Sequence, residues 1–232
     1  MNQTIKKISL TIVLAALASG TLMAQTKGRT FQQLGRVIAV PHSNVQIPYR
    51  DDNSDNPDAS IVIAKNLGPT GFTYVLDNGW LVTGATDVTF GGPDMIGVQF
   101  RPSVNCHATT LSAAITLFEG TKSVRLGIYD NNGMGGVGTL IQDGATTRMG
   151  NFGSCCSLAK VTLTNGGAAL TAGHDYFLVA TAGASDSGLV WSFVSPAGGG
   201  ANGQSFNNTN TGFTWDAEWT YYAAYEVQGT NP

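Results

Sequence analysis

The stretch "SVRLGIYDNNG", residues 123–133, shows the pattern that decides the fold class of this 232-residue chain. In it, the apolar residues Val124, Leu126 and Ile128 alternate with Ser, Arg, Gly and Tyr. Successive side chains of a β-strand point to opposite faces, so this period of two predicts a strand with one buried and one solvated face. The Asn-Asn-Gly that follows supplies turn residues, which indicates that the strand ends there.

Similar short segments follow one another from about residue 61 to residue 230. They are rich in β-branched and aromatic residues, and Gly, Asn, Asp and Pro separate them. The pair Asn78-Gly79, between "FTYVLD" and "WLVTG", is a strong hairpin-turn signal. Beyond the N-terminal leader no stretch has both helical period and helical length. We therefore predict a single all-β domain over 61–230, an antiparallel, jelly-roll-like β-sandwich, with a mobile loop at the Gly-rich residues 195–212.

The first 24 residues have the order of charge, apolar core and small-residue site that is typical of a secretory signal peptide. "MNQTIKK" is followed by "ISLTIVLAALA" and then by "SGTLMAQ". We predict cleavage after Ala24, with Gly20 as the second choice. The apolar run is short for a membrane span of about 20 residues, so we expect no span after cleavage. Residues 25–60 contain the acidic "YRDDNSDNPDAS" and are predicted to be a flexible segment, with edge strand or extended tail left open for "GRVIAVPHSNVQIPY", residues 35–49.

Charge and composition exclude several classes of partner. The 12 Lys and Arg residues are outnumbered by 15 Asp and Glu residues, for a net charge of −3. Such a chain has no basic footprint for nucleic acid or anionic lipid. Charged residues make up 12% of the chain, about half the usual share, and glycine is unusually frequent at 30 residues. This composition suits a secreted or periplasmic all-β protein.

Several segments carry a resemblance to a known family: "VQFRPSVNCHATTLSAAITLFEGTKSVRLGIYDNNGMGGVGTLI", "FGSCCSLAKVTL", "ALTAGHDYFLVATA" and "WSF". Over residues 66–229 the chain resembles the choice-of-anchor domains, which are secreted bacterial β-sandwiches. The resemblance implies an exported, surface-associated domain. It assigns no catalytic residue, because the biochemical function of that family is not established. The chain ends in "YEVQGTNP" without the family's C-terminal anchor, which favours a freely secreted or periplasmic product.

The three cysteines predict a crosslink, since disulfides form and persist in exported proteins. Cys155 and Cys156 are adjacent, and Cys106 lies about 50 residues upstream. A bridge from Cys106 to one of the pair would close a long loop and stabilise the fold by about 4 kcal/mol on the loop-entropy model. A bond between Cys155 and Cys156 would close almost no loop and needs a strained peptide. We favour the long bridge and keep the vicinal bond as the alternative.

Carboxylates and amides suggest two further sites, both with simpler explanations. Asp130 and Asn132 fit the first two ligand positions of a calcium loop, but the later positions do not fit, and Asn and Gly form hairpin turns by themselves. We expect no cofactor and keep calcium at these residues as the alternative. Asp216 and Glu218 are about 6–7 Å apart by strand rise, a separation that a glycoside hydrolase can use, although two solvated acids explain it as well.

Aromatic residues crowd the C-terminal stretch "GFTWDAEWTYYAAYEV". Flat aromatic faces on a rigid sheet bind sugar rings, and the same residues also fill sandwich cores. We therefore expect a secreted, non-enzymatic interaction domain whose partner is an extracellular polysaccharide or a surface protein. Carbohydrate binding is the specific form, and a hydrolase using Asp216 and Glu218 is the alternative. The candidate ligand-binding residues are Trp215, Trp219, Tyr221 and Tyr222.

Overall fold

The computed structural model has only strands, turns and bends in the part of the chain that it describes, which confirms the all-β prediction. Within those residues it contains no helix long and apolar enough to cross a membrane. For 23–26, 29–34, 37–39, 46–48, 72–73, 205–209 and 216–218 it describes the backbone alone. Backbone and side chains are described for 61–67, 74–87, 89, 92–154, 157–194, 215 and 222–232.

The described residues form nineteen strands. The first ten are β1 (Met23–Thr26), β2 (Arg29–Leu34), β3 (Val37–Ala39), β4 (Gln46–Pro48), β5 (Ile61–Lys65), β6 (Phe72–Thr83), β7 (Asp94–Phe100), β8 (Cys106–Ala113), β9 (Ile115–Glu119) and β10 (Val124–Asn131). The others are β11 (Val137–Thr146), β12 (Gly150–Asn151), β13 (Ala159–Thr162), β14 (Ala168–Leu170), β15 (Tyr176–Ala182), β16 (Gly188–Val194), β17 (Ser205–Thr209), β18 (Trp215–Glu218) and β19 (Tyr225–Thr230).

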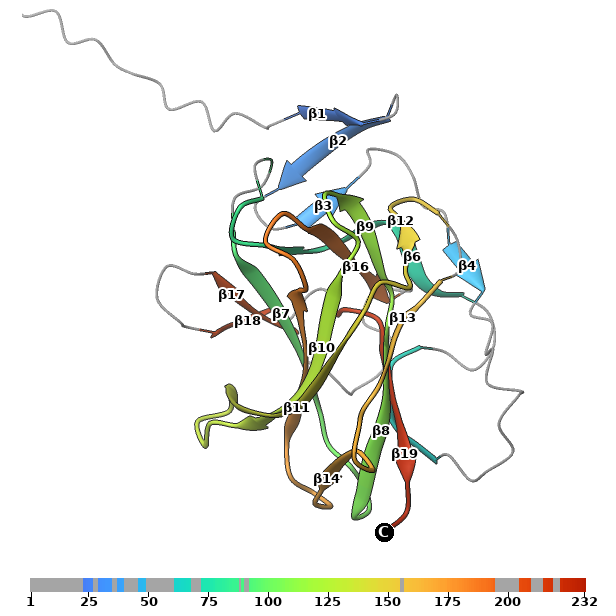
Figure 1. Ribbon diagram of the computed structural model, residues 1–232, viewed down its shortest axis with the longest axis vertical. Helices are drawn as coiled ribbons and strands as arrows, with labels where there is room; N and C mark the ends of the chain where they lie inside the picture. The colour runs from blue at the N-terminus through green and yellow to red at the C-terminus, as the bar shows by residue number, and fades with distance from the viewer. Residues whose placement is uncertain are drawn as a thin grey trace, which may run out of the picture.

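Two sheets pack together as a β-sandwich. The larger one has 14 strands, with the path β1-β2-β3-β6-β7-β15-β10-β11 and with β16 joining β6 to β9. The smaller one has five strands in the order β13-β8-β19-β5, with β14 also paired to β8. Figure 1 shows β7, β10 and β11 on one side of the molecule and β8 and β19 on the other. Almost all pairs are antiparallel, and the parallel pair of β12 with β9 is an exception.

The core lies between the two sheets and contains the alternating face that the sequence predicted for β10. Val124, Leu126 and Ile128 are fully buried in it. Trp191 of β16 and Tyr225 of β19 are the largest fully buried side chains, and the Trp191 Nε1–H donates to the carbonyl of Ala224 at 2.8 Å. A buried indole N–H needs such an acceptor, so this bond ties the two sheets together.

The predicted hairpin turn at Asn78-Gly79 is wrong, because β6 runs without interruption from residue 72 to residue 83. Gly79 lies in the middle of the sheet, opposite Ser192 of β16 on one side and Ile38 of β3 on the other. A Cβ at Gly79 would overlap with the carbonyl oxygen of Trp191. Glycine is therefore required here by close backbone approach and not by a turn.

The structure has strands in two further places where we predicted a loop or a flexible segment. Residues 205–209, inside the predicted mobile loop at 195–212, form β17 and pair with β7 and β18. Within 25–60, β3 pairs with β2 and β6, and β4 pairs with β6. The cleavage of residues 1–24 and the flexibility of the segment that follows stay predictions.

Candidate functional site

One face of the larger sheet points away from the core and carries the candidate site. It is formed by β7, β15, β10 and β11, whose registers place residues side by side in three rows. Rows of this kind bring side chains from distant parts of the sequence into direct contact. The first row is Thr181, Arg125 and Ala145, the second is Gly97, Val179, Gly127 and Asp143, and the third is Gln99, Phe177, Tyr129 and Leu140.

Trp215 of β18 lies over the second row. Its Cζ3 is 3.5 Å from the position that a Cβ on Gly97 would occupy, an ordinary contact distance, so the indole packs close to this glycine. The indole packs against a small apolar cluster of Val137, Phe177 and Val179. Trp215 itself remains half-buried.

Tyr129 lies over the same row from the opposite side. Its Cε2 is 3.1 Å from the position of a Cβ on Gly127, so this glycine makes room for the aromatic ring. Burial and the nearby Asp143 carboxylate raise the pKa of the Tyr129 phenol, which stays protonated and can donate a hydrogen bond. Leu140, opposite Tyr129 in the register, is 46% exposed.

An ion pair of Arg125 and Asp143 lies beside Tyr129 on this face. Arg125 Nε and Nη2 donate to Asp143 Oδ2 at 2.8 and 2.6 Å. The side chains are 47% and 23% exposed, so both keep capacity for a ligand. A guanidinium and a carboxylate held in fixed orientation can donate to and accept from vicinal hydroxyl groups.

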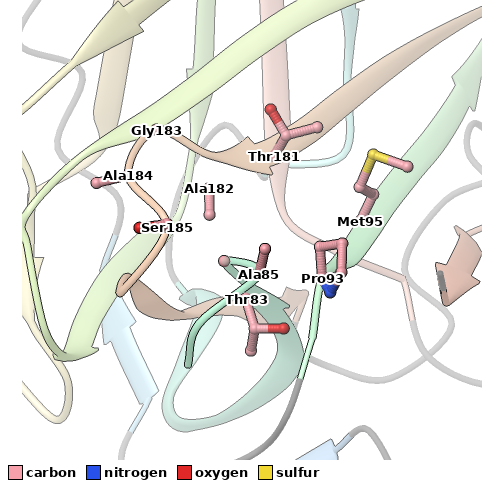
Figure 2. Close-up of a pocket in the computed structure, with 10 residues that line it drawn as sticks. Thr83, Ala85, Pro93, Met95, Thr181, Ala182, Gly183, Ala184 and Ser185 are labelled. Atoms are coloured by element: carbon pink, nitrogen blue, oxygen red, sulfur yellow. The ribbon is translucent and has the colours of Figure 1, made fainter. Parts of the chain in front are cut away.

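A pocket of about 280 Å³ opens where β6 and β15 end and β7 begins (Figure 2). Met95 and Thr181 reach it from the outer face, two residues along their strands from Gly97 and Val179. Since two residues of a strand span about 6.6 Å, the pocket adjoins the surface that Trp215 covers. The described residues that line it are Thr83, Gly84, Ala85, Pro93, Met95, Thr181, Ala182, Gly183, Ala184 and Ser185.

Of the four predicted aromatic residues, the structure describes the side chains of Trp215 and Tyr222, and these two lie in different clusters. Trp215 belongs to the outer face, whereas Tyr222 is half-buried in a different cluster with Leu67, Tyr74 and others. Trp219 and Tyr221 lie outside the described residues.

The predicted acid pair lies on β18. Asp216 and Glu218 are opposite Asn207 and Ser205 of β17. Their side chains are outside the described part of the structure, so the catalytic interpretation has no geometry to support it.

Cys106 is a buried free thiol in the structure, which gives no support to the favoured crosslink, and the pairing stays a prediction. Cys155 and Cys156 are outside the described residues. Cys106 begins β8, and Ala113, opposite Ala159 of β13, ends it, about 23 Å away at strand rise. In this antiparallel pair the chain before Ala159 continues away from Cys106, whereas a disulfide needs Cα atoms within about 7 Å.

The turn at 130–136 uses its polar side chains internally. Asn131 Oδ1 accepts the N–H of Gly133 at 2.8 Å, and Asn132 Oδ1 accepts those of Met134 and Gly136 at 2.8 and 3.0 Å. These are the bonds of Asn-built turns. Among the described residues no group of three or more His, Cys, Asp or Glu side chains could hold a metal ion, and calcium stays a prediction.

His174 and Asp130 form a pair that the sequence did not reveal. His174 Nε2 lies 2.6 Å from Asp130 Oδ1, and this hydrogen bond lowers the pKa of the Asp130 carboxyl. The imidazole also stacks edge-on against Tyr176, with ring centroids 4.8 Å apart. Both side chains of the pair are exposed, so this contact links β10 to the turn before β15 at the protein surface.

Sequence reasoning missed Tyr129, Arg125 and Asp143 as site residues. Each belongs to a different position of the β10–β11 hairpin, and only the strand register with β15 and β7 shows that they share a face with Trp215. A usable signal was the pair of glycines, Gly97 and Gly127, in the middle of strands.

Comparison with known proteins finds no matching protein-family model, no matching curated protein and no matching solved structure.

Proposed function

We propose that this chain is a secreted, non-catalytic domain that binds an extracellular carbohydrate on the outer face of β7, β15 and β10. One observation carries the proposal. Two half-buried aromatic residues lie on one face of the sheet, Trp215 against Gly97 and Tyr129 against Gly127. The ion pair of Arg125 and Asp143 lies on the same face, beside Tyr129. The leader-like residues 1–24 and the resemblance to exported sandwiches support the secreted location.

The chemistry of this face suits a sugar. The C–H faces of a pyranose ring are apolar and pack on an aromatic ring, and its hydroxyl groups need donors and acceptors at the ring edge. Trp215 supplies the flat face, while Arg125, Asp143 and the Tyr129 hydroxyl supply the polar groups. Placement on strands holds these groups in fixed relative positions, which limits the entropy lost on binding.

A pull-down with a panel of insoluble polysaccharides tests the proposal. We expect the purified domain to be retained by at least one polysaccharide without release of reducing sugar. Release of reducing sugar that is abolished by Glu218→Gln would replace the proposal with the hydrolase alternative. Retention by none of the polysaccharides, together with binding to a surface protein, would replace it with a protein-interaction role.

A further inference from the structure

We infer that the pocket at the ends of β6, β7 and β15 receives the acetamido group of an N-acetylated sugar. This inference rests on the proposed function, because the pocket is treated as an extension of the carbohydrate-binding face. It names the substrate class that the face alone leaves open.

The lining of the pocket selects an uncharged group. None of the described residues that line it is charged, so an unpaired carboxylate, phosphate or ammonium group would lose its hydration without compensation. The walls are largely apolar, formed by the side chains of Met95, Pro93 and Ala85 among others. Figure 2 shows Ala85 between Thr83 and Pro93, with Met95 and Thr181 above them.

The pocket also offers polar partners for an amide. Thr181 and Ser185 contribute hydroxyl groups, and a hydroxyl can both donate and accept. The hydroxyl of Thr83 differs, because its Oγ1 already accepts the N–H of Asp94 at 3.0 Å. An acetamido group combines a methyl group, which fits the apolar wall, with one donor and one acceptor, which fit Thr181 and Ser185.

Size and position favour a substituent of a sugar that already lies on the face. A volume of about 280 Å³ is at the lower end for ligand pockets, which usually hold about 300–1,000 Å³. Thr181 is opposite Arg125 in the register, and Met95 is two residues from Gly97, under Trp215. A sugar ring that stacks on Trp215 and hydrogen-bonds to Arg125 would therefore lie one row from the pocket, and a substituent of that ring could enter it.

Calorimetric titration with two matched tetrasaccharides tests the inference. The probes are the β-1,4-linked tetramers of N-acetylglucosamine and of glucose, which differ in the acetamido group. We expect the wild-type domain to bind the N-acetylated tetramer at least tenfold more tightly. Ala85→Phe should fill the pocket and remove this preference while the glucose tetramer still binds, and Thr181→Val should weaken the N-acetylated tetramer about two- to tenfold through one lost hydrogen bond.

Two variants of the same chemistry away from the pocket serve as controls. Ala172→Phe is in an exposed turn, and Thr162→Val is at an exposed position of β13. Both should keep the wild-type preference, and thermal melts should show that all four variants are folded. Sugar binding without an acetamido preference, or a preference that survives Ala85→Phe, would overturn the inference and leave the proposed function standing. Binding of no sugar by the wild-type domain would overturn both.

Discussion

Two glycines on different strands show how much a missing side chain can determine in this protein. A Cβ at Gly79 would overlap with the Trp191 backbone and lie 2.7 Å from Val190 Cγ1, so strands β6 and β16 would have to separate. At Gly97 the nearest atoms are side-chain atoms at 3.3 Å or more, which can move aside. The first glycine is required by the backbone, whereas the second lies against Trp215 at a distance that an added methyl group tolerates.

Substitution of alanine at these two glycines should therefore have unequal effects. We expect Gly79→Ala to lower the free energy of unfolding by about 1–3 kcal/mol, as overpacking does. Gly97→Ala should lower it by less than about 1 kcal/mol, because flexible side chains absorb the added methyl group. Denaturant titration of both variants measures the difference, and equal losses would contradict this account of β6.

An ion pair at the residue scale predicts a pH dependence. Arg101 Nε and Nη2 donate to the two carboxylate oxygens of Asp175 at 2.7 Å each, and this bidentate contact lowers the pKa of the Asp175 carboxyl. A carboxyl group whose pKa is depressed by folding stabilises the folded state above its unfolded pKa of about 3.9. That stability is lost as the pH falls through the lower folded value.

Asp175→Asn should therefore melt below the wild type at pH 6, and the two melting temperatures should converge as the pH falls below about 3.9. The size of the effect is modest, since Arg101 is exposed and solvent screens the pair. Thermal melts over a pH series measure it. A gap between the two proteins that widens toward low pH would show that the stabilising role of Asp175 does not depend on its charge.

At the scale of single strands, local alternation was a sufficient guide for β10. The core face of β10 followed from a period of two, because each buried residue has a polar or small neighbour in sequence. The same reasoning failed at Asn78-Gly79 and for β17, where pairing with distant strands decides the conformation. Turn propensity is a local quantity, and a central strand with neighbours on both sides overrides it.

The two faces of the β10–β11 hairpin should differ sharply in their contribution to stability. Leu126→Ala removes a fully buried side chain and should lower the free energy of unfolding by about 2–5 kcal/mol. Leu140→Ala, at a position 46% exposed, should lower it by less than about 1 kcal/mol. Urea titration of both variants checks this, and a larger loss for Leu140→Ala would mean that the hairpin is oriented the other way.

At the scale of the whole molecule, the fold class could be predicted from sequence, but the site could not. Trp215 was found from the aromatic-rich C-terminal stretch. Tyr129 and Arg125, on the same face, come from the β10–β11 hairpin about 90 residues earlier in the chain. Strands β7 and β15 lie between that hairpin and β17, and their pairing places these residues on one sheet. Contacts of such sequence separation have no local signal.

Cys106 is a free thiol buried in the core of the sandwich. Burial leaves this thiol inaccessible and raises its pKa, so the reactive thiolate is scarce. Cys106 should resist alkylation by iodoacetamide in the folded protein at pH 8 and react rapidly in denaturant. Peptide mapping identifies the labelled residue. A Cys106-containing peptide linked to Cys155 or Cys156 under non-reducing conditions would contradict the strand register of β8 with β13.

The carbohydrate-binding face is tested most directly by the affinity of two variants, Trp215→Ala and Phe152→Ala, for an oligosaccharide of the polysaccharide that retains the domain. Trp215→Ala removes the ring over Gly97, and Phe152→Ala removes a similarly half-buried ring that covers Leu81, Phe118 and Val190 elsewhere on the larger sheet. Both variants lose comparable packing, so a general effect on folding would appear in both. We predict that Trp215→Ala weakens binding at least tenfold in calorimetric titration, with Phe152→Ala within about twofold of the wild type. Equal affinities of Trp215→Ala and the wild type would contradict the assignment of this face.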